Sequence, residues 1–314
     1  MMLPPSDTLS VTAVPQGDGW TVVNGHYRVE TQAVSRMRDH HLDDDLILIS
    51  CLEEHYRRAI LAESDPSRRT DLYRQAYSEL SAIHEVRNQM DHGVSPHVLR
   101  LVAPYITNKT VLELGCGTGT FARTACGLAA SYTGMDASTV AIKLARKQVT
   151  APNAQFLVAS TTDPPDGIGP FDVIYSNDFL EHLHPADCAR TLSHCAKWLR
   201  PGGLLFSLIP NRLFGPFDIS RRYLPEGTAA RCLHLNELSH TDAAALFSAA
   251  GFTDLRSPLS PLRSYVSLPQ PIRRLLLAPL SIKAAAERTP LRRGLLVRPF
   301  GLRSVILFAR TGPQ

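Results

Sequence analysis

The spacing of apolar residues changes character about one third of the way along the chain. Up to residue 106, apolar residues recur every three or four positions over residues 43–62, 67–86 and 96–106, which predicts three helices. From residue 110 onward, short apolar runs alternate with amphipathic stretches, a pattern typical of a parallel sheet whose strands are joined by helices. The pattern therefore predicts a helical N-terminal region followed by an α/β core.

Within the core, the apolar runs predict seven strands and the amphipathic stretches predict four helices. The strands are expected at residues 111–114, 131–135, 154–159, 171–176, 203–209, 253–257 and 304–309. The helices are expected at residues 120–130, 138–149, 185–199 and 237–250. The expected fold class is α/β: a Rossmann-like, seven-stranded, mostly parallel sheet with helices on both faces and an N-terminal helical cap.

The same pattern gives provisional domain boundaries. Residues 1–92 form an N-terminal segment and the helical cap, in which 1–19 have the composition of disorder and 20–31 alternate like a short strand or hairpin. The core spans residues 93–259. A basic helical insertion follows at 260–303, and residues 304–314 hold the closing strand and a tail.

Composition is that of an ordinary soluble protein, with 44% hydrophobic and 20% charged residues among 314. There is no uninterrupted apolar stretch of roughly 18 residues, and the start of the chain is rich in proline and polar residues, so we expect a cytoplasmic location. The six cysteines are scattered without a CxxC pair, which argues against a structural zinc site and a disulfide scaffold.

Charge is concentrated in the insertion, because residues 260–303 contain nine Lys or Arg and one acid, Glu287. Basic amphipathic pieces of this kind can lie on an anionic membrane surface. The alternative is that their leucines pack on the N-terminal helices while the arginines remain solvated. We favour packing, since prolines divide the segment into short pieces, at Pro271, Pro279, Pro290 and Pro299. Nucleic acid is not expected as a partner, because few aromatic residues are interleaved. No feature of the sequence indicates an oligomeric state.

A glycine-rich turn follows the first core strand, in the segment Leu114-Gly-Cys-Gly-Thr-Gly119. A strand, a glycine turn and a helix place backbone N–H groups at the carboxyl edge of a sheet, which suits adenosine cofactors. Dinucleotide binders require Gly-x-Gly-x-x-Gly or Ala, whereas Thr120 occupies the third position here. Glu113, just before the turn, would repel a phosphate and suit an ammonium or sulfonium group. The cofactor implied therefore lacks a pyrophosphate.

A carboxylate ends the second core strand, at Asp136, about 20 residues after the glycine turn. At that position a carboxylate can accept hydrogen bonds from the two vicinal hydroxyls of a ribose. The turn and the carboxylate together predict an adenosine cofactor more strongly than either does alone.

The motifs resemble those of the class I S-adenosylmethionine-dependent methyltransferases. Residues 111–122, 134–138, 171–182 and 199–205 are similar to the first, second, fourth and fifth motifs of that family, and the resemblance covers about residues 90–260. It implies S-adenosylmethionine as the methyl donor and S-adenosylhomocysteine as the product. The residues that it implies for cofactor binding are Glu113, Gly115, Cys116, Gly117, Asp136, Ala137, Ser160, Thr161 and Asn177.

One position departs from the family. After the third strand the family usually has Gly-Asp, whereas this chain has Ala159-Ser160-Thr161. Adenine recognition by a carboxylate is not provided at this position, so Ser160 or the backbone must substitute.

Candidate catalytic residues follow the fourth strand, where Asp178, Glu181 and His182 have the spacing of one helical face. Three interpretations are open: the Glu-His pair caps and packs the turn, His182 or the later His234 is a general base, or these four side chains hold a divalent metal. We do not favour the metal. The Glu-His pair is similar to that of the ubiquinone-pathway O-methyltransferases.

A long segment at residues 210–234 should lie over the carboxyl ends of the strands and form part of an acceptor pocket. Asn211, Arg212 and Tyr223 are its candidate substrate contacts, and the arginines indicate an acidic acceptor. The expected reaction is transfer of a methyl group to a small molecule, more probable at oxygen than at nitrogen or carbon, on a natural product or a sugar-like compound. The alternative from another class is a protein that binds the cofactor without methylating, as a partner subunit.

Overall fold

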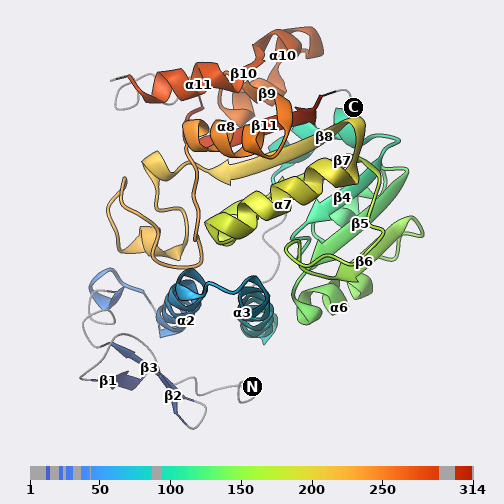
Figure 1. The fold of residues 1–314 in the computed structure, drawn as a ribbon. Helices are drawn as coiled ribbons and strands as arrows, with labels where there is room; N and C mark the ends of the chain where they lie inside the picture. Colours follow the sequence, from blue (N-terminus) through green and yellow to red (C-terminus); the bar gives the residue numbers. More distant parts are fainter. Residues whose placement is uncertain are drawn as a thin grey trace. The chain divides into compact units, whose positions relative to one another are not determined.

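A computed structural model describes residues 12–14, 21–23, 26–30, 37–42, 44–86, 94–289 and 301–312 (Figure 1). The chain divides into two compact units. Unit 1 contains Met1–Met90 and Arg212–Leu235, and unit 2 contains Asp91–Asn211 and Asn236–Gln314. The segment that the sequence assigned to an acceptor pocket is thus grouped with the N-terminal helices.

Unit 2 is built on an eight-stranded sheet with the order β10-β9-β11-β8-β7-β4-β5-β6. Its strands are β4 (Thr110–Leu114), β5 (Ser131–Asp136), β6 (Ala154–Val158), β7 (Phe171–Asn177), β8 (Leu199–Pro210), β9 (Phe252–Pro258), β10 (Leu277–Pro279) and β11 (Ser304–Thr311). The five strands from β4 to β8 pair in parallel, and β11 runs antiparallel between β8 and β9. All seven predicted strands are present, and β10 is an eighth that we did not predict.

The helices of unit 2 agree with the predicted positions, with one clear difference. They are α4 (Pro96–Ile106), α5 (Ala122–Ala125), α6 (Thr139–Gln148), α7 (Pro185–Trp198), α8 (His240–Ala249), α9 (Leu262–Ser267), α10 (Gln270–Leu276) and α11 (Leu280–Glu287), with the 3-10 turn η1 (Leu180–His182). The helix expected at 120–130 is only four residues long, because the chain turns at Cys126–Leu128, where Gly127 lies. Capping explains other boundaries: Ser138 accepts from Ala141 N–H, and Ser239 and Asp242 form a capping box on α8.

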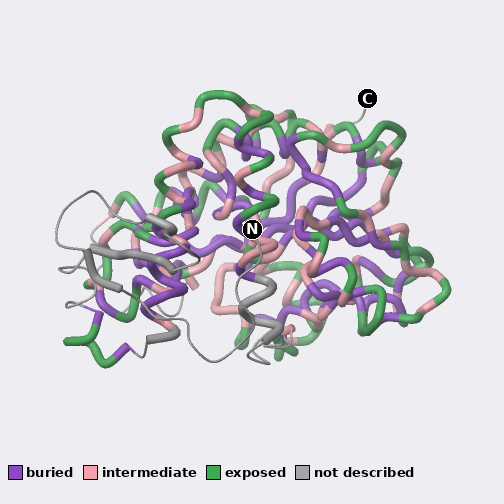
Figure 2. The backbone as a smooth tube through the Cα atoms, turned by 90° about the horizontal axis from the view of Figure 1, so that it is seen from below, coloured by how far each residue is buried: buried purple, intermediate pink, exposed green. Residues whose placement is uncertain are grey.

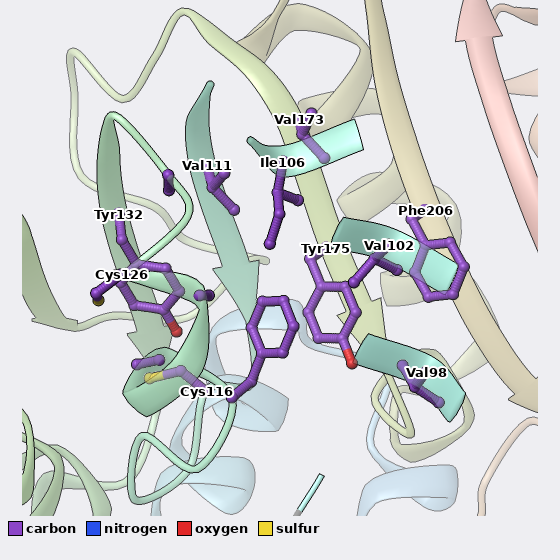
Figure 3. Close-up of a cluster of buried hydrophobic side chains, with 14 of the residues drawn as sticks. Val98, Val102, Ile106, Val111, Cys116, Cys126, Tyr132, Val173, Tyr175 and Phe206 are labelled. Carbon is purple, nitrogen blue, oxygen red and sulfur yellow. The ribbon is translucent and has the colours of Figure 1, made fainter. Parts of the chain in front are cut away.

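Alternate residues of the central strands pack against helices on opposite faces of the sheet, as the period of two requires. On one face, Tyr132, Tyr175 and Phe206 are buried together with residues of α4, α5, α6 and α9 (Figure 3). Tyr175 stacks on Phe121 and on Phe206, with ring centroids 3.9 and 5.5 Å apart. On the other face, α7 contacts β8, and α8 contacts β9 and β11. Figure 2 shows that stretches of buried residues run through the inner part of the backbone tube, whereas exposed residues gather in its outer turns.

The basic insertion packs within unit 2 over its described part, residues 260–289. Helix α9 contacts α4, α11 contacts α8, and β10 pairs antiparallel with β9. Leucines of this segment pack in the same cluster as α4 residues, and β10 extends the core sheet at its edge. Packing on the helices at 43–62 and 67–86 stays a prediction. Residues 290–300 lie outside the described residues.

Unit 1 contains helices α2 (Asp44–Ala62) and α3 (Pro66–Val86), the 3-10 turns η2 (Arg212–Phe214) and η3 (Ile219–Arg222), and a three-stranded sheet. The strands are β1 (Thr12–Val14), β2 (Thr21–Val23) and β3 (His26–Glu30). Strands β2 and β3 form the predicted antiparallel hairpin. Strand β1 lies in the segment that we expected to be disordered; the rest of residues 1–19 is outside the described residues. A small core of Met37, Leu42, Ile47, Cys51 and Tyr223 joins α2 to the 212–235 segment.

None of the helices in the described ranges combines the length and the apolar character needed to cross a membrane.

Candidate active site

The glycine turn leaves β4 at the centre of the sheet, where β4 pairs with β5 on one side and β7 on the other. Strand order reverses between these neighbours, and ligands of open α/β sheets bind at such a point. Gly115, Gly117 and Gly119 all have positive φ, at 65°, 51° and 82°. A Cβ on Gly115 would lie 2.5 Å from the ring of Phe179, which follows β7. The turn after β4 and the turn after β7 are therefore in contact.

Asp136, at the end of β5, is joined directly to the glycine turn. Its carboxylate accepts hydrogen bonds from the N–H of Gly117 at 2.9 Å and from the N–H of Ser138 at 2.8 Å. Burial raises the pKa of Asp136, and the N–H bonds from Ser138, Gly117 and Ala137 oppose that rise. The sequence predicted both features separately, and the structure brings them into hydrogen-bond contact.

Glu113 directly precedes the glycine turn, Cys116 lies within it, and both are buried. Glu113 accepts a hydrogen bond from the hydroxyl of Tyr132 on β5. Burial raises the pKa of Glu113 to about 8, and the hydrogen bond from Tyr132 opposes that rise. Burial also raises the pKa of the Cys116 thiol well above its ordinary value, which makes this thiol unreactive.

Ser160 and Thr161 follow β6 and are buried in a tight turn. The Ser160 hydroxyl is 2.7 Å from the Thr162 hydroxyl, and the Thr161 hydroxyl is 2.8 Å from that of Thr191 on α7. Asp163, which sequence reasoning missed, forms a backbone bridge with Ser160, and its side chain is exposed. In the sequence, Asp163 could have been noticed because it is a carboxylate only three residues after position 160, where the family pattern Gly-Asp has its aspartate.

Asn177 and Asp178 end β7 at the same edge of the sheet. The Asn177 amide donates to the Asp178 carboxylate at 2.8 Å, and Asp178 has a positive φ of 49°. The turn η1 then places Glu181 in the interior, fully buried, and leaves His182 partly exposed. The backbone carbonyl of Glu181 accepts from the N–H of Asn236 at 2.9 Å.

Asn211, a predicted substrate contact, is instead a buried structural group of unit 2. Its amide donates at 2.6 Å to the Glu287 carboxylate and at 2.6 Å to the Leu302 carbonyl. Glu287 also accepts from the ring of His240 at 2.6 Å. Asn211 is fully buried, so its amide connects the end of β8 to α11 and is not available to a substrate.

The remaining acceptor candidates lie in unit 1. Tyr223 is buried in the small core, with its hydroxyl 3.5 Å from the Cys232 sulfur. Tyr223 is buried, and its contact with a substrate stays a prediction. Arg212 is exposed at the start of η2, and His234 is partly exposed.

The fold and the turn define an α/β protein with an adenosine-cofactor site at the carboxyl edge of its sheet. Residues 86–257, more than half of the chain, match the family model described as a methyltransferase domain. The chain therefore belongs to this family, in agreement with the resemblance of its motifs to those of the class I S-adenosylmethionine-dependent methyltransferases.

Among curated relatives, it is 34% identical over 127 residues to the ubiquinone biosynthesis O-methyltransferase of Thiobacillus denitrificans, covering 38% of this chain and 53% of that protein. It is 30% identical over 159 residues to a probable S-adenosylmethionine-dependent methyltransferase of Mycobacterium tuberculosis, covering 50% of this chain and 54% of that protein. The chain thus spans about half the length of the curated relatives it matches.

A solved structure shares the fold at low identity. The 1,6-didemethyltoxoflavin-N1-methyltransferase of Burkholderia thailandensis, determined with 1,6-didemethyltoxoflavin and S-adenosylhomocysteine bound, has a TM-score of 0.51 and 18% identity. The match covers 80% of this chain and 92% of that one. At this identity the likeness establishes the fold alone.

Proposed function

We propose that this methyltransferase modifies an oxygen atom of a small molecule, a natural product or a sugar-like compound. The observation that carries the cofactor half of the proposal is the 2.9 Å hydrogen bond between the Gly117 N–H and the Asp136 carboxylate. Support for oxygen as the acceptor atom comes from relatives in several bacteria that are named ubiquinone biosynthesis O-methyltransferase.

The residues around the turn fit S-adenosylmethionine. A Cβ on Gly117 would meet nothing within 4 Å, so open space lies beside the Asp136 carboxylate. The Asp136 carboxylate accepts N–H bonds from Ser138, Gly117 and Ala137 and still has lone-pair capacity, which we propose accepts a ribose hydroxyl. We place the methionine part near Glu113, Gly115 and Cys116.

We propose that the turn after β6 and Ala137, next to Asp136, hold the adenine end, and that Asn177 closes the site near the sulfonium. Thr161 uses its hydroxyl in a bond to Thr191, so its contribution to adenine binding would come from the backbone. Asp163 is an exposed carboxylate whose backbone pairs with Ser160 in this turn. We propose that it replaces the carboxylate that the family pattern has at position 160.

When bound, the cofactor supplies a methyl group that its sulfonium already activates. The protein must align the acceptor oxygen with that methyl and remove the hydroxyl proton as the new O–CH3 bond forms and the S–CH3 bond breaks. His182 and His234 are the proposed bases, and the proton passes to an imidazole nitrogen. Asp178, held by the Asn177 amide, fixes the end of β7 beside His182. We propose metal-free chemistry.

The charge of the 212–235 segment points to an acidic acceptor. Arg212, Arg221 and Arg222 are all exposed, and a guanidinium binds a carboxylate or a phosphate bidentately. We therefore propose an acceptor that carries an anionic group, which the arginines can bind, and a hydroxyl group, which a histidine base can deprotonate.

Titration calorimetry with S-adenosylmethionine tests the cofactor site. Mass spectrometry for the gain of one methyl group tests the reaction, across a panel of phenols, sugars and their carboxylated or phosphorylated forms. We expect methylation of a hydroxyl on an acidic compound, lost in His234→Ala or His182→Ala and unchanged by EDTA. Cofactor binding without any methylated product would contradict the enzymatic proposal, and loss of turnover in EDTA would contradict metal-free chemistry.

A further inference from the structure

Three consecutive residues immediately before His234 are each held by α2 or by the η3 turn, all within unit 1. Arg231 donates through its side chain to Glu54 at 2.9 Å and through its backbone N–H to the Ser220 hydroxyl at 3.2 Å. These two bonds fix the first residue of the run, so the segment that leads to His234 is ordered by contacts far apart in the sequence.

The next two residues are fixed in the same way. The N–H of Cys232 donates to the Asp218 carboxylate at 2.7 Å, and its thiol contacts the Ser50 carbonyl at 3.6 Å. The N–H of Leu233 donates to Glu53 Oε2 at 3.3 Å. Glu53 therefore lies against the backbone of the residue that directly precedes His234, and His234 lowers the pKa of Glu53 by electrostatic attraction.

We propose that Glu53 is a positioning residue for His234: its carboxylate holds the Leu233 backbone and stabilises the protonated imidazole. This inference rests on the proposed function, in which His234 is a candidate base. The acceptor's hydroxyl proton moves to the imidazole, the imidazolium is stabilised by the adjacent carboxylate, and the proton then passes to solvent. No further reactant is needed. Helix α2 thereby contributes to the chemistry as well as to folding.

The charged neighbours of Glu53 come from two elements. Asp218, at the start of η3, raises the pKa of Glu53, whereas the Leu233 N–H and His234 lower it. Glu53 and Asp218 both raise the pKa of the Cys232 thiol. Burial is the largest influence and raises the pKa of Glu53 to about 7. Glu54, the next residue of α2, is different, because its carboxylate pairs with Arg58 at 2.9 Å and with Arg231 at 2.9 Å. Glu54 is thus a matched control on the same helix.

The test is a pH titration of His234 in the full chain, which requires no acceptor. Histidine labelled with carbon-13 is followed by NMR from about pH 5 to about pH 9, and His234→Gln identifies the His234 signal. We expect Glu53→Gln to lower the midpoint of the His234 titration by about one pH unit, since an opposite charge that interacts with His234 is removed. Glu54→Gln should leave the midpoint unchanged. An unchanged midpoint in Glu53→Gln would overturn the proposal.

A reciprocal measurement keeps Glu53 in place in case its substitution disrupts folding. With carbon-13 in the glutamate carboxyls, Glu53 should titrate at higher pH in His234→Gln than in the wild type, because the imidazolium no longer favours the carboxylate. An identical Glu53 midpoint in both proteins would also overturn the proposal. Neither result depends on turnover, so failure of the proposed function appears separately, as full activity of His234→Gln on an identified acceptor.

Discussion

Gly115 and Gly117 both have left-handed backbone torsions, but their surroundings differ. At Gly115 the space for a Cβ is filled by the ring of Phe179, whereas at Gly117 it is open. Substitution by alanine at Gly117 should introduce backbone strain alone, whereas substitution by alanine at Gly115 should introduce backbone strain and a steric clash with Phe179.

We predict that Gly117→Ala lowers the free energy of unfolding by about 1 kcal/mol, the cost of a left-handed alanine. Gly115→Ala should cost more, because Phe179 must also move, and should weaken S-adenosylmethionine binding by displacing the turn after β7. Urea unfolding and calorimetry measure the two quantities. Equal destabilisation by both substitutions would show that Phe179 does not restrain the turn.

Asp136 carries the second prediction at the scale of a residue. Asp136→Asn should weaken S-adenosylmethionine binding about tenfold or more, because hydrogen bonds to a charged acceptor contribute roughly 1.5–3 kcal/mol. Asp172→Asn is the control: its carboxylate accepts from Thr110 at 2.9 Å and from Arg200 at 2.8 Å, near the start of β7. Its loss should affect unfolding in urea and leave the calorimetric affinity unchanged. Equal affinity losses in both variants would remove Asp136 from the cofactor site.

At the scale of the element, strands were predictable wherever a run of apolar residues is buried on both faces of the sheet. Strand β10 was not, because Leu277–Pro279 is only three residues long and ends in proline. Asn211 shows why some site residues could not be predicted from the sequence. Its polar side chain follows a strand and resembles a ligand-binding group, but its partners Glu287 and Leu302 are distant in sequence. Only tertiary structure brings them together.

Helix α11 carries a buried lysine that should make stability depend on pH. The Lys283 ammonium donates to the Gly301 carbonyl at 3.0 Å, and burial lowers its pKa from 10.5 to about 7. Between these values the unfolded chain binds more protons than the folded chain, so the free energy of unfolding should rise as pH increases from about 7 toward 10.5.

Lys283→Met should remove this part of the pH dependence, because methionine has a similar length and no charge. Lys143→Met, at an exposed position, should leave the slope unchanged. Urea unfolding at a series of pH values measures the slope in each protein. A slope that persists in Lys283→Met would assign the pH dependence to another group.

At the scale of the whole molecule, the candidate residues divide by role. All those proposed for the cofactor lie in unit 2, together with His182 and Asp178, whereas Arg212, Tyr223 and His234 lie in unit 1. The sequence predicted the cofactor residues from compact motifs in one stretch of chain. Unit 1 is discontinuous, and no motif in the sequence connects Glu53 on α2 to residues 231–234, which explains why that contribution was missed.

This division predicts how S-adenosylhomocysteine changes hydrogen exchange. Binding should slow exchange of the amides at Gly117 and Ser138, which already bond to the Asp136 carboxylate, because the ligand stabilises the bound form of unit 2. Amides of α2 and of residues 231–233 should exchange as in the free protein, since no proposed cofactor residue lies there. Mass spectrometry of peptides from both units provides the comparison, with Asp136→Asn as the control that should lose the protection. Equal protection in α2 would mean that unit 1 takes part in cofactor binding, and the assignment of roles to the two units would then be wrong.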